Sequence, residues 1–559
     1  MKRALALALA LLAVAAPAAG AHATLESTVP ARGSAEETAP GQVELRFSEP
    51  VELALGAVRV YDAEGREVQA GDAFHPEGSS SAVAVRLRDG LGDGGYTVTY
   101  KVVSADSHPI SGGFVFAVGE GAAPPAAGVA ELLGDQKAGP VTSVAFAIAR
   151  GVQYGAIALG LGLLFVILLA WRPALRAAGA PAAAAAAFDA RARTLLLVAA
   201  AAGVASAVVA IGLQAATAQG TTFWSGIGSA DEVLDTRFGT VWAAGAAAWL
   251  VAGGLALARR PLLAAVPLCL LALLPGLGGH AGVQDPVAVL LPANVLHVLG
   301  ASAWIGGIAA LVVALPAATR ALEPERRTPL LAATMGRFST VALAGVAALL
   351  AGGILQSLLQ LDAVDDLWDT AFGRAILVKI GIVLALLGLG ALNRRRILPA
   401  LDRAAAAGAA PGRAGTLLRR SLRAEVALGI AAFAATGALA GHAPGTAQPT
   451  GPYSASAALG PARAELTVEP ARAGPNELHL YLFDAKDGTQ FDVPRDLTIT
   501  AALPESGIEP IALDVRKAGP GHYVVGGAPF SPAGDWQLEM AARISEFDEL
   551  RTRFEVPVR

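Results

Sequence analysis

The pattern of hydrophobic and polar positions divides the chain into three parts. In the first part, short runs alternate between apolar and polar residues and are separated by Gly, Pro and Asp; they cover 43–47, 57–61, 83–87, 96–103 and 114–118. Alternation with a period of two is typical of strands that bury one face. We therefore predict a small antiparallel β-sandwich over residues 22–119, followed by an Ala/Pro/Gly-rich linker over 120–142.

Eight long apolar stretches make up the middle of the chain, and each is close to the ~20 residues that a helix needs to span a bilayer. They cover residues 143–171, 194–217, 239–258, 262–279, 287–315, 337–360, 373–393 and 421–441. This pattern predicts an eight-helix membrane domain over 143–442. After a Gly/Pro-rich linker over 443–461, alternation returns in 478–482 and 536–540, which predicts a second β-sandwich over 462–559.

Arginine is distributed unequally between the loops that join these stretches. One set of loops carries Arg172, Arg176, Arg191, Arg193, Arg259, Arg260, Arg320, Arg326, Arg327, Arg394, Arg395, Arg396, Arg403, Arg413, Arg419 and Arg420. The opposite set carries only Arg237 and Arg374 and is otherwise acidic. Loops rich in Arg and Lys remain in the cytoplasm. We therefore expect a multi-pass protein with both termini on the extracytoplasmic side.

The first 21 residues have the three regions of a secretory signal peptide. Lys2 and Arg3 precede an apolar run over 4–16, and the small residues Ala19-Gly20-Ala21 follow. The apolar run is too short to span a bilayer. We therefore expect residues 1–21 to be cleaved off, which makes His22 the amino terminus; an uncleaved anchor is the alternative.

Composition narrows the classes of function. Only 16% of the residues are charged, against about 25% in a soluble protein. A formal net charge of -4 offers no basic surface, so we expect no nucleic-acid partner. The single cysteine, Cys269, lies in an apolar run where we expect it to be buried, which excludes cysteine-based metal or redox sites. Methionine is too scarce for a soft-metal site.

A candidate metal site lies near the end of the first predicted sandwich. Asp106 and His108 are two residues apart, so on an extended segment both side chains leave the same face. If His22 is the amino terminus, its free α-amine and its ring nitrogen can chelate one metal ion together. With His108 this gives three nitrogens and leaves Asp106 for a further position, a tetragonal set of N and O donors that suits Cu(II).

Other interpretations of these residues stay open. Zinc fits less well because the chelate favours a planar arrangement over a tetrahedron, and calcium requires more oxygen ligands. His108, which precedes Pro109, is also compatible with a turn histidine beside Asp106 as a capping residue, and no metal would then bind.

Three segments of this sandwich resemble the CopC family of periplasmic copper-binding proteins. They are His22–Ala31, Leu45–Pro50 and Ser104–Gly112. The resemblance implies that His22, Asp106 and His108 bind Cu(II), one ion per N-terminal domain. It also implies that Glu49 lies near the metal, where we expect it to orient a ligand imidazole. Family members with a Cu(I) site are rich in methionine, and residues 22–119 contain none, so we expect a site for Cu(II) only.

Two segments of the membrane domain resemble the CopD family of eight-helix inner-membrane copper proteins. They are Leu296–Gly307 and Phe372–Lys379, the second of which is followed by Asn393-Arg394. The resemblance implies that copper moves across the bacterial inner membrane, and inward. Our candidate ligands there are His280, His297 and His442, although each also fits a role in helix packing or at the membrane interface. The last sandwich resembles YtkA-like domains, in which His479 and His522 either bind a metal or are structural.

Polar residues inside a span are costly and therefore point to function. Asn294, His297 and Trp304 share one face of the fifth predicted helix, which is typical of a vestibule. The inner halves of the spans contain almost no donor, so the sequence predicts no exit path.

The predicted fold class is a multidomain membrane protein with an N-terminal β-sandwich of the cupredoxin or immunoglobulin type, an eight-helix transmembrane bundle and a C-terminal β-sandwich. We predict that this protein is not an enzyme, that it captures Cu(II) outside the plasma membrane, and that it transports copper in homeostasis and resistance. The expected partners are copper ions, the lipid bilayer and a periplasmic copper donor. The chain has no G-x-x-x-x-G-K-[ST] motif of an ATP-driven pump.

Three other functions use the same residues. His280, His297 and His442 can ligate haem in a membrane redox protein if two of them face each other at one depth. An amino-terminal copper chelate also occurs in copper monooxygenases, although the first sandwich lacks the length and the aromatic face for a polysaccharide. A copper sensor or scaffold would need no transport path.

Overall fold

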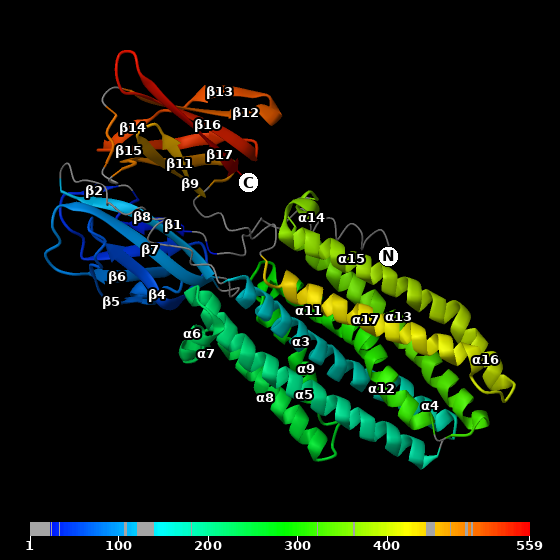
Figure 1. Ribbon diagram of the computed structural model, residues 1–559. Coiled ribbons are helices and arrows are strands. Elements are labelled where there is room, and N and C mark those ends of the chain that lie inside the picture. Colours follow the sequence, from blue (N-terminus) through cyan, green and yellow to red (C-terminus); the bar gives the residue numbers. More distant parts are fainter. Residues whose placement is uncertain are drawn as a thin grey trace. The chain divides into compact units, whose positions relative to one another are not determined.

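The computed structural model describes residues 23, 25–32, 34–104, 109–119, 139–179, 181–320, 322–361, 364–442, 453–469, 471–486, 490–493 and 496–558. They form two compact units, of which one holds the helices and the other holds the strands at both ends of the chain (Figure 1).

The N-terminal strands form two four-stranded sheets around one core. The sheets have the orders β1-β3-β6-β5 and β2-β8-β7-β4. Val43, Leu45 and Phe47 of β3 are buried in this core, as the alternation predicts. The strands are β1 (Leu25–Val29), β2 (Ala35–Glu36), β3 (Gln42–Phe47), β4 (Val51–Tyr61), β5 (Gln69–Phe74), β6 (Ala82–Leu87), β7 (Gly94–Ser104) and β8 (Pro109–Val118), with the 3-10 turn η1 (Pro76–Gly78) before β6.

The C-terminal strands also form two sheets, with the orders β14-β15-β11-β10-β9 and β13-β12-β16-β17. Trp536 and Phe530 are fully buried between them. The elements are β9 (Tyr453–Leu459), β10 (Ala462–Glu469), β11 (Gly474–Asp484), β12 (Leu497–Leu503), the 3-10 turn η8 (Pro504–Ser506), β13 (Ile508–Ala512), β14 (Arg516–Gly519), β15 (His522–Phe530), β16 (Gly534–Arg543) and β17 (Glu549–Val558). Strand β9 lies inside the predicted linker 443–461, because it pairs with β10 although its Ala and Ser residues give little hydrophobic alternation.

The middle of the chain is helical. Its elements are α3 (Pro140–Phe165), the π-helix η2 (Val166–Trp171), α4 (Arg172–Ala177), α5 (Ala182–Gln219), α6 (Phe223–Gly226), η3 (Ile227–Ser229), α7 (Ala230–Leu234), α8 (Arg237–Leu257), α9 (Ala265–Leu271), α10 (Leu274–Leu277), η4 (His280–Gly282), α11 (Val287–Ala301), the π-helix η5 (Ser302–Gly306), α12 (Gly307–Thr319), α13 (Pro324–Gln360), α14 (Asp366–Asp369), α15 (Ala371–Leu392), the π-helix η6 (Asn393–Ile397), α16 (Leu398–Ala406) and α17 (Gly412–Leu439).

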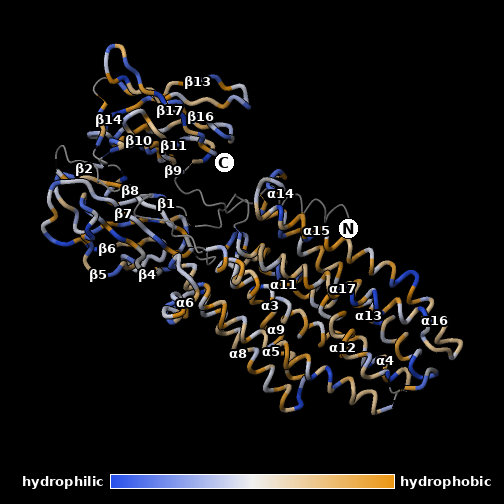
Figure 2. The backbone as a smooth tube through the Cα atoms, in the orientation of Figure 1, coloured by the Kyte–Doolittle hydropathy of each residue, from blue (hydrophilic) through white to orange (hydrophobic). Residues whose placement is uncertain are grey.

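The outer faces of the long helices are apolar as well as their buried faces. Leu250, Leu384 and Ile430 are 64%, 62% and 66% exposed, and hydrophobic residues follow most of the length of each long helix (Figure 2). A surface of this kind fits lipid and not water. The helical unit is therefore that of a multi-pass membrane protein.

The prediction of eight spanning helices is wrong in its fourth member. Seven helices among the described residues are long and apolar enough to cross a membrane, and residues 265–277 form only a shorter apolar helix. Pro267, Pro275 and the following glycines break the fourth stretch into α9 and α10. Thirteen residues of helix extend about 20 Å, which is less than the ~30 Å of a bilayer core. Cys269 on α9 is exposed and not buried.

The broken fourth stretch still returns the chain along the bundle. Arg259 and Arg260 follow the C-terminal end of α8, whereas Arg237 at its N-terminal end donates a hydrogen bond to the carbonyl of Gly282, at 2.9 Å. Residues 261–282 therefore lead from one end of α8 back to the other.

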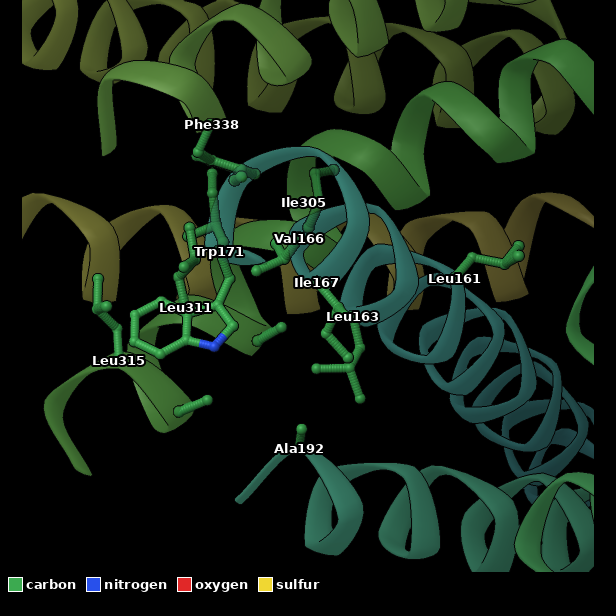
Figure 3. Packing of buried hydrophobic residues seen from close by; sticks show 14 of the residues in the cluster. Leu161, Leu163, Val166, Ile167, Trp171, Ala192, Ile305, Leu311, Leu315 and Phe338 are labelled. Atoms are coloured by element: carbon green, nitrogen blue, oxygen red, sulfur yellow. The ribbon is translucent and has the colours of Figure 1, made fainter. Parts of the chain in front are cut away.

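Helix α3 and its continuation η2 lie in the middle of the helical unit. Figure 3 shows Val166, Ile167 and Trp171 of η2 among side chains of other helical segments, including Leu311 of α12, Ile305 of η5 and Phe338 of α13. Glycine permits the closest approach: a Cβ atom on Gly306 would lie 1.9 Å from the carbonyl oxygen of Ala158. Small residues let membrane helices touch backbone to backbone, and this contact fixes η5 against α3.

The first and last long helices are joined near one end. The buried guanidinium of Arg150 on α3 donates to the carbonyl of Ala440 at 2.7 Å and lies 3.8 Å from the ring centroid of Phe146. A Cβ atom on Gly437 of α17 would lie 2.1 Å from the carbonyl oxygen of Ala147. Helices α3 and α17 are therefore in direct contact there.

Candidate metal centre

The three predicted Cu(II) ligands, His22, Asp106 and His108, lie outside the described residues. The structure does describe the strands on either side of the Asp106–His108 segment. Strands β7 and β8 are neighbours, and Val103 pairs with Pro109 across them. Ala23 is buried in the core of the same sandwich, 3% exposed. The chain on both sides of Asp106 and His108, and Ala23 directly after His22, are thus part of one folded domain.

Glu49 lies in the short connection between β3 and β4 and is half-buried. The backbone is held on both sides of it, because the amide of Phe47 donates to Ser81 and the amide of Val51 donates to Ser80, at 2.8 Å and 2.9 Å. Its predicted place beside the metal stays a prediction.

Lys101 is a charged residue of the first sandwich that the sequence analysis missed. It lies in β7, its side chain is 8% exposed, and its Nζ atom has no hydrogen-bond partner among the described residues. Burial lowers the pKa of Lys101 to about 8. The alternation of β7 offered no signal for it, because valines and tyrosines surround the lysine and every position from Gly95 to Ser104 is buried.

In the helical unit, His297 on α11 faces α13. Its Nδ1 atom lies 2.8 Å from the carbonyl oxygen of Leu349. A carbonyl only accepts hydrogen bonds, so Nδ1 carries the proton and Nε2 of the neutral ring keeps its lone pair. Metal-binding histidines usually donate their other nitrogen in this way. Gly353 makes room for the ring, since a Cβ atom there would lie 2.9 Å from Nδ1.

Further polar groups surround His297. Asn294, one turn earlier on α11, donates to the side chain of Gln356 on α13 at 2.9 Å. The Oδ1 atom of Asn294 is enclosed and accepts no hydrogen bond from the described residues. Lys379 of α15 is near enough to His297 for an electrostatic interaction. Trp304 lies beyond the start of η5, where the α-helical spacing that we assumed no longer holds.

His280 and His442 are placed differently. His280 is buried, 9% exposed, in the turn η4. His442 follows α17, and much of its side chain is exposed. Removal of part of its ring from water, and then the positive charges of Arg374 and Arg150, lower the pKa of His442. Among the described residues there is no group of three or more His, Cys, Asp or Glu that could hold a metal ion. The three candidate histidines are therefore not gathered into one site.

The C-terminal sandwich brings its two histidines together. His479 Nδ1 and His522 Nε2 are 3.2 Å apart, and the ring of Tyr481 stacks on His522 with centroids 4.4 Å apart. Both histidines are buried, so each nitrogen of this pair is satisfied by the other. This arrangement favours the structural role for the pair. Nearby, Glu469 at the end of β10 forms an ion pair with Arg32, which follows β1 of the first sandwich.

Glu425, a buried acidic residue of the helical unit, was not identified from the sequence. Glu425 of α17 is 2% exposed and accepts a hydrogen bond from Asn393 at 2.5 Å. In the sequence it follows a run of arginines, which made residues 412–420 resemble a cytoplasmic loop. The only signal was the i, i+4 spacing of Ser421 and Glu425 at the start of an apolar stretch.

Three domain families match this chain. The CopC domain matches residues 25–119, the copper resistance protein D-like N-terminal domain matches residues 141–290, and copper resistance protein D matches residues 332–439. The first covers the N-terminal sandwich, and the other two cover most of the helical unit.

Individual relatives match either nearly the whole chain or a segment of about 100 residues. The copper transport protein CutJ of Bacillus subtilis (strain 168) is 27% identical over 558 residues, which cover 96% of this chain and 95% of that protein. Copper resistance protein C of Pseudomonas syringae pv. tomato is 34% identical over 107 residues, or 18% of this chain and 82% of that protein. Protein YobA of Escherichia coli (strain K12) is 33% identical over 102 residues, with the same two coverages of 18% and 82%.

Two solved structures are similar to the N-terminal part. CopC from Methylosinus trichosporium OB3b is 27% identical, with 17% of this chain and 93% of that chain covered and a TM-score of 0.16. The methionine-rich PcoC from Escherichia coli is 30% identical, with 17% and 98% covered and a TM-score of 0.15.

A CopC domain followed in one chain by apolar helices of the copper resistance protein D type defines a membrane-spanning protein of the copper-resistance class. The chain belongs to the family in which a CopC domain and a CopD domain are joined in a single polypeptide. The likeness of the C-terminal sandwich to YtkA-like domains stays a prediction.

Proposed function

We propose that this protein binds Cu(II) on the extracytoplasmic side of the bacterial inner membrane and transports copper inward through its helices. The observation that carries the proposal is the union of a CopC domain and a CopD domain in one chain that resembles CutJ along 96% of its length. The proposed topology, with a cleaved signal peptide and both termini outside, rests on the distribution of arginine. It also requires that residues 261–282, which return along α8 although their helices are short, count as a crossing.

The proposed capture site consists of the α-amine and ring of His22 together with Asp106 and His108, and Glu49 orients one of the imidazoles. This donor set favours Cu(II). A linker between the two domains raises the effective concentration of the capture domain at the helices to about millimolar if it behaves as a short flexible connection.

One experiment tests the capture site directly. The full chain is compared with a variant that carries one additional alanine before His22, and Cu(II) binding is followed by electron paramagnetic resonance. The additional residue removes the free amine from His22 and leaves every side chain unchanged. We expect one tetragonal Cu(II) in the native protein and an affinity lower by orders of magnitude in the extended one. His75→Gln in the same sandwich is the control, and equal binding by all three proteins refutes the site.

The proposed entry point into the helices is the Nε2 atom of His297. His297→Gln should reduce copper uptake into proteoliposomes about tenfold or more, because the lost nitrogen is a ligand. Ser357→Ala is the matched control, since Ser357 lies one turn from Gly353 on α13. Among the described residues its hydroxyl bonds only to the carbonyl oxygen of Gly353, at 2.9 Å. Uptake by His297→Gln at the native rate would contradict this assignment.

A further inference from the structure

One face of α15, extended by the first residue of η6, carries a regular line of residues. Phe372, Lys379, Leu386 and Asn393 recur every seven positions; three of them are buried and Lys379 is half-buried. A seven-residue spacing keeps side chains on one side of a helix. Lys379 lies at the level of His297, and Asn393 follows it by fourteen residues, which is about 21 Å along the axis. This face therefore connects the polar region around His297 with the arginine-rich end of the helix.

At that end Asn393 holds Glu425. The amide of Asn393 donates to Oε1 of Glu425 at 2.5 Å, and the hydroxyl of Ser421 donates to the same oxygen at 3.4 Å. Glu425 is 2% exposed and Asn393 is 8% exposed. Asn393 is also the first residue of η6, and single π-helical turns inside membrane helices are frequent at functional sites.

No cation among the described residues compensates the carboxylate of Glu425. Helix α17 itself carries Arg413, Arg419, Arg420 and Arg423, η6 carries Arg394, Arg395 and Arg396, and α16 carries Asp402 and Arg403; all nine side chains are exposed. Helix α15, which also packs against α17, carries the exposed Arg374 and the half-buried Lys379, and Lys379 lies about 21 Å from Asn393 along the helix. Within α3, which also packs against α17, the one charged residue is Arg150, and it binds the carbonyl of Ala440 at the opposite end of α17. None of the described residues forms an ion pair with Glu425. An unpaired charge inside a membrane domain is unfavourable, and such a group can instead take up a proton.

Asn393 can serve both protonation states of Glu425. Its NH2 group donates to the carboxylate, while its Oδ1 atom is buried and has no partner among the described residues. If Glu425 binds a proton, its new O–H group can donate to that oxygen once the amide has turned over. An asparagine thus satisfies the site before and after the proton arrives.

We propose that Glu425 is a proton-binding site at the arginine-rich end of the helical unit, and that copper movement is coupled to its protonation. The proton comes from water on that side, binds a carboxylate oxygen, and leaves by the same route. This inference rests on the proposed copper transport for its second half only. Proton binding by Glu425 does not depend on whether the protein transports copper.

The test uses the full chain in proteoliposomes and two measurements. Infrared difference spectra follow the C=O stretch of a protonated carboxyl group as the pH changes, and copper flux is measured with Cu ions while the pH on the arginine-rich side is varied. We expect a carboxyl signal in the native protein that disappears in Glu425→Gln and persists in Asp402→Asn, which removes an exposed carboxylate nearby. Native flux should change with pH, and flux through Glu425→Gln should not.

Asn393→Ala provides an independent variant if Glu425→Gln does not fold. It should raise the midpoint of the carboxyl signal by about one pH unit, because the hydrogen bond that Asn393 donates to the charged carboxylate is stronger than the one that it accepts from the protonated group. An unchanged signal in Glu425→Gln, or an unchanged midpoint in a folded Asn393→Ala, overturns the proton site. A titrating Glu425 with native flux independent of pH overturns the coupling. A titrating Glu425 in a protein that moves no copper overturns the proposed function and leaves the proton site standing.

Discussion

Acid should weaken the C-terminal sandwich through its paired histidines. His479 Nδ1 and His522 Nε2 share one hydrogen bond, which requires that at least one ring is neutral. Burial, and then the neighbouring charge of His479, lowers the pKa of His522 to about 3; burial also lowers the pKa of His479. In the unfolded chain both histidines bind protons near their ordinary pKa of about 6.5.

The size of the effect follows from this difference in proton binding. Between pH 6.5 and pH 3 the unfolded state holds a proton on His522 that the folded state lacks, so stability that is present above pH 6.5 is lost as the pH falls. In this range, each unit by which the pH falls lowers the free energy of unfolding by about 1.4 kcal/mol for one histidine. Between pH 7 and pH 5, His522 alone should lower the free energy of unfolding by about 2 kcal/mol.

Hydrogen exchange of β11 and β15 in the full chain measures this loss without separating the domain. After correction for the intrinsic exchange rates, the free energy of opening should fall by about 2 kcal/mol between pH 7 and pH 5. His522→Gln should reduce that fall, because glutamine does not titrate, whereas His75→Gln in the first sandwich should not. The reasoning fails if native opening energies are equal at both pH values, or if His522→Gln shows the same fall as the native protein.

Three shorter predictions concern other parts of the molecule. Gly306→Ala should prevent η5 from meeting Ala158 and lower the yield of folded protein and its melting temperature, whereas Gly388→Ala, with no atom within 4 Å of the added carbon, should leave both unchanged. Lys101→Met should stabilise the first sandwich by roughly 1–3 kcal/mol at pH 7, with a smaller gain as the pH rises above 8, in denaturant titrations followed by hydrogen exchange. Thr370→Ala should cost about 1 kcal/mol by removing the acceptor for the amide of Gly373, and Thr370→Ser should restore protection of the first turn of α15.

The sequence pattern predicted the strands well because their signal is local. In β3 and β10 every second residue is buried, so alternation alone locates the strands and the core. Seven of the eight predicted spans were found for the same reason, since length and hydropathy are properties of one segment. The fourth span was wrong because the hydropathy of 262–279 is unaffected by Pro267 and Pro275, whereas helix geometry is strongly affected by them.

The polar sites depend on contacts between segments that are far apart in the chain. The hydrophobic pattern of a single sequence does not indicate which distant segments come into contact. His297 was identified as a polar residue in an apolar stretch, but its bond to Leu349 depends on how α11 packs against α13. Glu425 was missed because its partner Asn393 is 32 residues away and its own neighbours are arginines. The proposed ligands His22, Asp106 and His108 came from motif spacing, and they stay predictions.

The contact between Arg150 and Ala440 has a consequence for the order in which the protein is made. The two residues are 290 positions apart, and they join the first long helix of the membrane unit to the last. During synthesis, α3 is therefore inserted long before its partner α17 exists, and Arg150 has no carbonyl of Ala440 to bind until the final helix has left the ribosome. The contact between Arg150 and Ala440 can therefore form only after the last span is complete. A chain terminated before α17 would leave the guanidinium of Arg150 without this carbonyl.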